Sequence, residues 1–173
     1  MSFRPDGPVG VRFTACLTIA VSAAAVGCGG GGEPSKSDYY GSIDSFCGAV
    51  ASAAKQVSKD TLAVQKDTGA DRTKVVKVVA DSLQQFADST ENALQDLEKT
   101  GVPKAFSAYQ DGTSSGFRTF ITTLRSTAKA AQKDGAGALS QLGPKLNAVK
   151  LPDPPKDVTA NAKACASFTP AGG

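Results

Sequence analysis

Apolar side chains recur at three- and four-residue intervals along three long stretches of the chain, and polar side chains fill the positions between them. Such spacing puts the apolar side chains on one face of an α-helix. The first stretch runs from Ser42 to about Gln65, the second from Asp71 to about Lys99 and the third from Pro103 to about Asp134. Each stretch predicts one long amphipathic helix.

Residues that start and stop helices lie at the ends of these stretches. Ser42 is suited to cap the first helix, Asp71 favours the first turn of the second, and Gly135 favours an end to the third. The valines at 75–79 would also suit a strand, but the longer helical period outweighs them. The polar patch DGTSSG at 111–116 keeps the phase of the third stretch, so we expect one helix with room for a kink there.

The C-terminal part of the chain has a weaker pattern. Residues 138–149 carry leucines at helical spacing, but Gly143 and Pro144 interrupt them, so we expect this segment to be broken or only partly helical. LPDPP at 151–155 is expected to be extended, with Asp153 or a neighbour capping a last short helix. The predicted fold is all-α: an antiparallel bundle of three long helices plus a short C-terminal helix.

The N-terminal region has the organisation of a secretory signal peptide. Residues 1–12 contain Arg4 and Arg12, and residues 13–27 carry no charge. The apolar run is shorter than the roughly 20 residues that a membrane-spanning helix needs. We therefore expect residues 1–27 to direct export and to be removed.

The end of this leader, Ala25-Val26-Gly27-Cys28, resembles the lipobox of bacterial lipoproteins. In that family a diacylglycerol is attached to the cysteine thiol, and the leader is cut just before the cysteine. The resemblance implies that Cys28 is the lipidated N-terminus and that residues 28–41, which include GGGGEPSKSD, form a flexible tether. The alternative is an ordinary signal-peptidase cut that leaves Cys28 as a free thiol or a disulfide partner.

The remaining cysteines suggest a cross-link. Cys16 lies in the leader and Cys28 at its end, which leaves Cys47 and Cys165, one near each end of the expected bundle domain at 42–168. In an oxidising compartment the simplest use of two such cysteines is a disulfide, which would join the first and last helices and close the bundle. Two buried thiols that act as small apolar side chains are the alternative. Residues 169–173 are expected to be a loose tail.

The whole chain resembles a broad class of small helical lipoproteins of high-GC Gram-positive bacteria. The likeness rests on AVGC, the glycine-rich segment after it, an early SIDSFCGAV and a late VTANAKACA. It implies a location on the extracytoplasmic face of the bacterial cell membrane, with the lipid on Cys28 as the membrane contact. Many members of this class have no assigned activity, so the resemblance implies no mechanism.

Composition removes most enzymatic templates. Histidine is absent, which excludes Ser-His-Asp and Cys-His relays and histidine-ligated zinc. The 19 basic and 16 acidic side chains are interspersed, without the concentrated basic face that favours nucleic acid. We expect no cofactor and no metal site, and a non-enzymatic binding or interaction module whose partner is an envelope protein or a lipid.

Two short elements match the sequences of penicillin-binding enzymes. They are Ser52-Ala-Ala-Lys55 and Lys99-Thr100-Gly101. That family also needs a Ser-x-Asn element, which this sequence lacks, and a mixed α/β domain much larger than this chain. We therefore interpret the match as chance.

The third stretch contains the sharpest candidate for a ligand site. Small residues alternate there with aromatic ones, at Tyr109, Gly112, Gly116, Phe117 and Phe120. This arrangement would leave an apolar slot for a lipid or isoprenoid chain, so a carrier of a small apolar ligand is the second functional hypothesis. The competing interpretation is that the glycines let two helices approach closely while the aromatic side chains fill the core.

Two adjacent tyrosines, Tyr39 and Tyr40, lie beside the expected tether. Tyrosine favours membrane interfaces, so the pair would suit a membrane-facing edge. Ordinary packing at the end of the bundle is an equal alternative.

Overall fold

The computed structural model describes residues 33–67 and 69–168, all of which belong to the unit Gly32–Gly173, whereas the unit Met1–Gly31 and the tail at 169–173 lie outside the described residues. Every element in the described ranges is helical, and η denotes a 3₁₀ turn. The elements are α1 (Lys36–Lys66), α2 (Arg72–Glu98), η1 (Lys104–Phe106), α3 (Ser107–Asp134), α4 (Ala136–Ser140), α5 (Leu142–Asn147), α6 (Lys156–Asn161) and η2 (Lys163–Phe168). The predicted all-α fold is confirmed.

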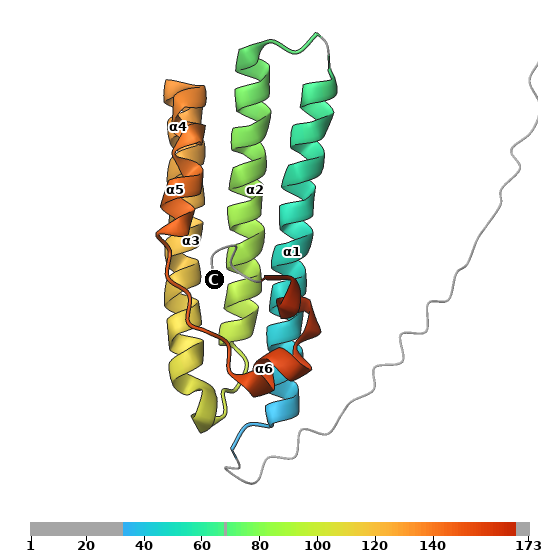
Figure 1. Ribbon diagram of the computed structural model, residues 1–173, viewed down its shortest axis with the longest axis vertical. Helices are drawn as coiled ribbons and strands as arrows, with labels where there is room; N and C mark the ends of the chain where they lie inside the picture. The colour runs from blue at the N-terminus through green and yellow to red at the C-terminus, as the bar shows by residue number, and fades with distance from the viewer. Residues whose placement is uncertain (1–32, 68, 169–173) are drawn as a thin grey trace, which may run out of the picture. The chain divides into compact units, whose positions relative to one another are not determined.

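The three long helices lie side by side, each antiparallel to the next (Figure 1). α2 packs against both α1 and α3, α4 and α5 return along α3, and α6 and η2 lie against α1. The extended segment between α5 and α6 crosses from the α3 side of the bundle to the α1 side (Figure 1). The fourth side of the bundle is therefore covered by four short helical pieces and one extended segment. The interrupted helix and the extended segment after it agree with the prediction, and the 3₁₀ turn η2 adds to the one short helix predicted at the end.

The core is one continuous cluster to which each long helix contributes a stripe. Apolar side chains at helical spacing are buried in it, as the pattern predicted. The main members are Tyr39, Ile43, Phe46 and Val50 on α1, Ala80, Leu83, Ala87, Leu94 and Leu97 on α2, and Phe117, Ile121, Leu124, Ala128 and Ala131 on α3. Since complete burial of one large apolar side chain contributes about 1.5–3 kcal/mol, this cluster is the main source of the bundle's stability.

The first helix begins earlier than the sequence predicted. Its N-cap is Ser35, whose hydroxyl accepts a hydrogen bond from Asp38 N, whereas Ser42 lies inside the helix and donates to Asp38 O (3.0 Å). The added turn buries Tyr39 in the same stripe as Ile43, which offsets the low helix propensity of Gly41. The predicted limits of the tether at residue 41 and of the domain at residue 42 are therefore wrong.

The residues just before α1 are also held by the domain. Glu33 Oε1 accepts a hydrogen bond from Lys104 N at 2.7 Å. Pro34 lies against Gly101 so closely that a Cβ there would be 2.8 Å from Pro34 Cγ. The chain is thus fixed at the junction of α2 and η1 from Glu33 onward.

The second helix agrees with the prediction, and the predicted third helix is the 3₁₀ turn η1 followed by α3, which begins at Ser107. Asp71 caps α2 by accepting a hydrogen bond from Lys74 N (2.7 Å), and the valines at 75–79 are helical. α3 is continuous through 111–116 and ends at Gly135, where φ is 81°. Glycine adopts this conformation without the strain that a Cβ would bring.

The segment at 138–149 is broken, as predicted, but the position of the break and the cap of the last helix differ from the prediction. The break between α4 and α5 falls at Gln141, because Pro144 is the third residue of α5, where a helix has no internal partner for the N–H that proline lacks. Asp153 does not cap α6, since Pro155 occupies the N-cap position and makes no side-chain hydrogen bond.

Candidate functional site

The predicted lipid attachment site, Cys28, lies outside the described residues, so lipidation stays a prediction. Among residues 33–67 and 69–168, no helix is both long enough and apolar enough to cross a membrane.

The predicted disulfide is confirmed. Cys47 on α1 is bonded to Cys165 on η2, with a Cα–Cα distance of 5.0 Å. Two further contacts hold η2 on α1: Asp44 Oδ1 accepts a hydrogen bond from Ala164 N (2.7 Å), and a Cβ on Gly48 would lie 3.9 Å from Ala164 Cβ. The last turn is therefore bound to the N-terminal half of α1 both covalently and by a partly buried hydrogen bond.

The predicted apolar slot on α3 is occupied by the chain itself. The residues 150–154, named the strap here, are extended and lie over Gly112 and Gly116. A Cβ on Gly116 would stand 2.6 Å from Leu151 Cδ2 and 2.7 Å from Lys150 O, and one on Gly112 would stand 3.2 Å from Pro152 Cγ. The two glycines thus permit a close approach, as the competing interpretation held, but of an extended segment rather than of a second helix.

The other members of the predicted slot separate into two groups. Tyr109 and Phe117 face the strap and line a cavity beneath it, whereas Phe120 packs edge-on against Phe86 of α2, with ring centroids 5.6 Å apart. Burial raises the pKa of the Tyr109 hydroxyl, and a hydrogen bond with Thr113 opposes part of that rise. Phe120 therefore belongs to the α2–α3 contact and not to the slot.

The cavity beneath the strap is small and mostly apolar, at about 100 Å³. Its wall on α1 is Ile43, Phe46 and Cys47, its wall on α3 is Tyr109, Thr113 and Phe117, and its cover is Leu151, Pro152, Asp153, Pro154 and Cys165. Sites for small molecules usually enclose about 300–1,000 Å³. With the strap in place, the cavity is therefore too small for a lipid chain.

Tyr39 belongs to the core rather than to a membrane-facing edge. It has no exposed surface, stacks on Phe106 with ring centroids 5.2 Å apart, and donates its hydroxyl proton to Gln110 Oε1 at 3.1 Å. Burial raises the pKa of this hydroxyl far above its ordinary value. Tyr40 is half-buried and meets the same Phe106 ring edge-on at 5.7 Å. Packing at the end of the bundle explains both side chains.

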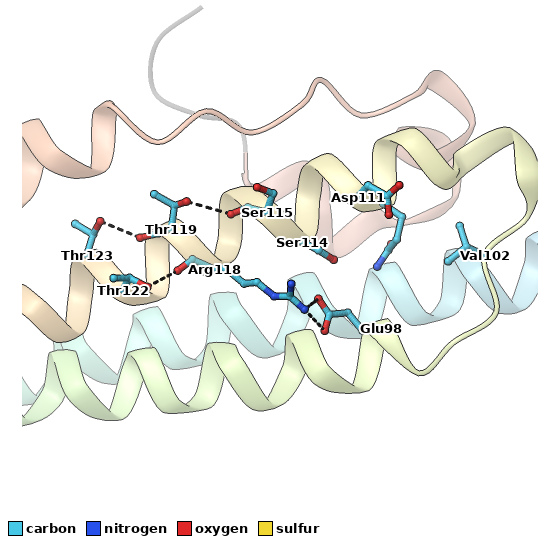
Figure 2. A pocket seen from close by; sticks show the side chains of 10 residues that line it. Glu98, Val102, Asp111, Ser114, Ser115, Arg118, Thr119, Thr122 and Thr123 are labelled. Atoms are coloured by element: carbon cyan, nitrogen blue, oxygen red, sulfur yellow. Dashed lines mark hydrogen bonds and ion pairs between the residues drawn. The ribbon is translucent and has the colours of Figure 1, made fainter.

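A polar groove between α2 and α3 was not predicted from the sequence (Figure 2). It encloses about 720 Å³, which is in the range of small-molecule sites at about 300–1,000 Å³. Its lining consists of Glu98, Val102, Gln110, Asp111, Ser114, Ser115, Arg118, Thr119, Thr122 and Thr123. The signal in the sequence was the run of hydroxyl residues on α3, which also fits an ordinary solvated helix face.

Hydroxyl groups and one ion pair set the chemistry of this groove. Thr119, Thr122 and Thr123 each donate to the carbonyl four residues earlier, so their hydroxyl oxygens can only accept a hydrogen bond from a partner (Figure 2). Arg118 reaches across to α2, where its Nη2 donates to both carboxylate oxygens of Glu98 at 2.9 Å (Figure 2). The groove is thus rich in acceptors and suits a polar partner that carries N–H or O–H donors.

A second arginine on α3, Arg125, also pairs with carboxylates of α2, and we call these contacts together with the Arg118–Glu98 pair the polar seam. Arg125 donates to Asp88 and to Glu91 on α2, and hydrogen bonds to these two carboxylates raise the pKa of its guanidinium. The seam therefore joins α2 and α3 by two arginines.

The two elements that match penicillin-binding enzymes do not form a site. Thr100 Oγ1 donates to Ser42 Oγ at 3.1 Å. Since Ser52 is ten residues further along α1, about 15 Å of helix separates it from that contact. Within the part of the chain that the structure describes, no group of three or more acidic or cysteine side chains is placed to hold a metal ion.

Comparisons with known proteins yield no relative. No protein-family model matches the chain, and no curated protein and no solved structure matches it.

Proposed function

We propose that this chain is a membrane-anchored lipoprotein of the bacterial cell envelope, in which Cys28 carries the lipid and the bundle acts as a non-enzymatic binding module. The supporting sequence features are the basic start, the apolar run and the AVGC that ends it. Two acyl chains on one cysteine would hold the protein firmly, whereas one chain binds a membrane only marginally.

The observation that carries the proposal is the pairing of Cys47 with Cys165. Disulfides persist in oxidising, extracytoplasmic compartments and are rare in the cytosol, so the bond supports export. The pair also uses both cysteines of the bundle domain. Cys28, at the end of the apolar run, is then left for attachment to lipid.

The fixed position of Glu33 gives the proposed anchor a short reach. Five Cα–Cα steps separate Cys28 from Glu33, and at most about 3.6 Å per step gives a limit of about 18 Å. We had expected a tether through residue 41. The domain is proposed to work close to the membrane surface, within reach of lipid headgroups and of other envelope proteins.

The polar groove is the surface we propose for binding. It is the larger of the two cavities described above, and its acceptor oxygens and the Arg118–Glu98 pair offer polar contacts to a partner. Hydroxyl groups and an exposed ion pair are compatible with a surface that stays hydrated until a partner binds.

Intact mass spectrometry of protein from the membrane fraction of a lipoprotein-processing bacterial host tests the anchor. The expected species begins at Cys28 and carries added acyl mass. Cys28→Ser should remain unacylated, while the matched variant Cys16→Ser, which changes a residue of the leader, should give the same acylated species as the wild type. An unlipidated mass that begins at another residue would overturn the proposal.

A second candidate function is the carriage of a small apolar ligand. The observation that favours it is the cavity between α1 and α3, into which the predicted site residues Tyr109 and Phe117 face. Native mass spectrometry of the purified protein separates the two candidates, because a stoichiometric apolar ligand is expected only for a carrier.

A further inference from the structure

The strap covers a trough between α1 and α3 and is held at both ends. On its N-terminal side, α5 packs on α3, and on its C-terminal side α6 and η2 pack on α1, where the Cys47–Cys165 bond fixes them. The residues between these two attachments lie over Gly112 and Gly116 without any helical structure of their own. The segment is therefore placed as a cover whose ends stay attached when its middle moves.

Side-chain and van der Waals contacts alone hold the middle of the strap. Within the part of the chain that the structure describes, residues 150–154 make no hydrogen bond and no ion pair. Pro152 and Pro154 have no N–H to bond, and Leu151 remains 36 % exposed although it lies on Gly116. Segments with few buried contacts and no backbone hydrogen bonds open at low free-energy cost. Lifting the strap therefore breaks no hydrogen bond.

The trough beneath the strap suits an occupant without hydrogen-bonding groups. Its walls are mostly apolar and aromatic side chains such as Phe46 and Phe117, with Thr113 as a polar exception, and its floor is the Cα surface of Gly112 and Gly116. A peptide would have to leave its backbone N–H and C=O groups unpaired there, which costs free energy. The strap lowers this cost because its prolines have no N–H group to leave unpaired. A hydrocarbon chain has no hydrogen-bonding group and therefore does not incur this cost.

Building on the second candidate function, we propose that residues 150–154 are a lid over a binding site for a linear hydrocarbon chain. The lid leaves Gly112 and Gly116, the hydrocarbon chain takes its place between α1 and α3, and the existing cavity of about 100 Å³ becomes part of the site. The Cys47–Cys165 bond keeps η2 on α1 throughout, so the bundle stays intact while the lid is open.

Binding of a fluorescent fatty acid, dansyl-labelled undecanoic acid, to the purified protein tests this lid. Gly116→Ala places a Cβ where Leu151 and the Lys150 carbonyl now lie and so displaces the strap, and Leu151→Ala removes the side chain that rests on Gly116. Because a closed site weakens apparent affinity by the fraction of molecules that are open, each variant should bind the probe about tenfold more tightly than the wild type. Gly41→Ala, on α1 with open space around it, is the matched control and should bind as the wild type does.

Circular dichroism identifies variants that have lost their helices, and Leu151→Ala keeps the test valid if Gly116→Ala does not fold. Equal binding by the wild type and both folded variants would overturn the lid and leave the carrier function standing. No binding by any folded protein would overturn both. If the peptide KLPDP, which has the sequence of the strap, bound to the Leu151→Ala variant and the probe did not, the choice of a hydrocarbon chain as the ligand would be overturned. Each result is independent of the intact mass that reports on Cys28.

Discussion

The Tyr39 hydroxyl of α1 donates to Gln110 Oε1 of α3 at 3.1 Å, in a part of the core where the two residues are 0 % and 5 % exposed. This hydrogen bond joins α1 to α3 directly, as does the edge-on contact between the rings of Phe46 and Phe117, whose centroids are 4.7 Å apart. Gln110 Nε2 is buried without a partner among the described residues. If the amide were turned over, its oxygen would be the unpaired atom instead. One atom of the Gln110 amide therefore stays unsatisfied in either orientation.

Tyr39→Phe should lower the free energy of unfolding by about 1–3 kcal/mol, because it leaves the Gln110 amide with no partner on either atom. The double variant Tyr39→Phe/Gln110→Met should recover most of this loss, since no buried polar group is then left unpaired. Urea denaturation of the wild type, both single variants and the double variant measures the coupling. Losses that simply add in the double variant would contradict it.

Cys47→Ala/Cys165→Ala should lower the free energy of unfolding by about 2–5 kcal/mol, because the unfolded chain is no longer constrained by the cross-link. The bond joins residues 118 positions apart, so it restricts most of the bundle. Thermal unfolding followed by circular dichroism in the presence and absence of a reductant provides the measurement. The reductant should shift the midpoint of the wild type and leave that of the double variant unchanged.

Gly135→Ala should destabilise the bundle by about 1–3 kcal/mol, since φ is 81° and ψ is −159° at this residue, a backbone conformation that essentially only glycine adopts. Gly137, two residues later in α4, has open space where a Cβ would be. Gly137→Ala should therefore be neutral or should stabilise by up to about 1 kcal/mol through helix propensity. A Cβ has open space at both positions, so a difference between the two midpoints of thermal unfolding reports the backbone strain at Gly135.

The pKa of Asp67 is lowered by hydrogen bonds from Lys74 and from Gly69 N. A carboxyl group with a lowered pKa in the folded state contributes stability above its unfolded pKa, and that contribution is lost as the pH falls through the folded pKa. Lys74→Ala should raise the pKa of Asp67 toward its ordinary value. Lys77→Ala, whose lysine pairs with Asp81, should leave the pKa of Asp67 unchanged. Carboxyl titration by NMR reads the pKa directly.

Helices could be predicted from the sequence where their apolar residues lie on one continuous face. The apolar stripes identified α2 and α3 because each helix buries one continuous face, and two cysteines on such faces pointed to the disulfide. The start of α1 was missed because the contacts that hold it, from Glu33 to Lys104 and from Pro34 to Gly101, join residues far apart in the sequence. The glycine-rich composition before α1 suggested a flexible tether through residue 41, but these long-range contacts hold the chain from Glu33 onward.

In the candidate site, too, features set by one helix could be predicted, whereas features set by contacts between distant segments could not. Gly112 and Gly116 were correctly identified as places of close approach, but no local signal in α3 could show that the segment at 150–152 occupies them. The polar groove was missed because serines and threonines at helical spacing look like any hydrated surface. Arg118 and Glu98 become a pair only when α2 lies beside α3.

The bond between Cys47 and Cys165 turns the bundle into a covalent ring of the residues between them. A protease that cuts this ring once, in the exposed strap for example, opens it without releasing a fragment, because both new ends remain joined through the cystine. The cut ends stay packed on the helices that hold them. Such a nicked molecule keeps its mass under oxidising conditions, apart from one added water, and separates into two peptides only after reduction. With the anchor proposed at Cys28, a chain closed in this way would keep both pieces attached to that anchor after a single cut.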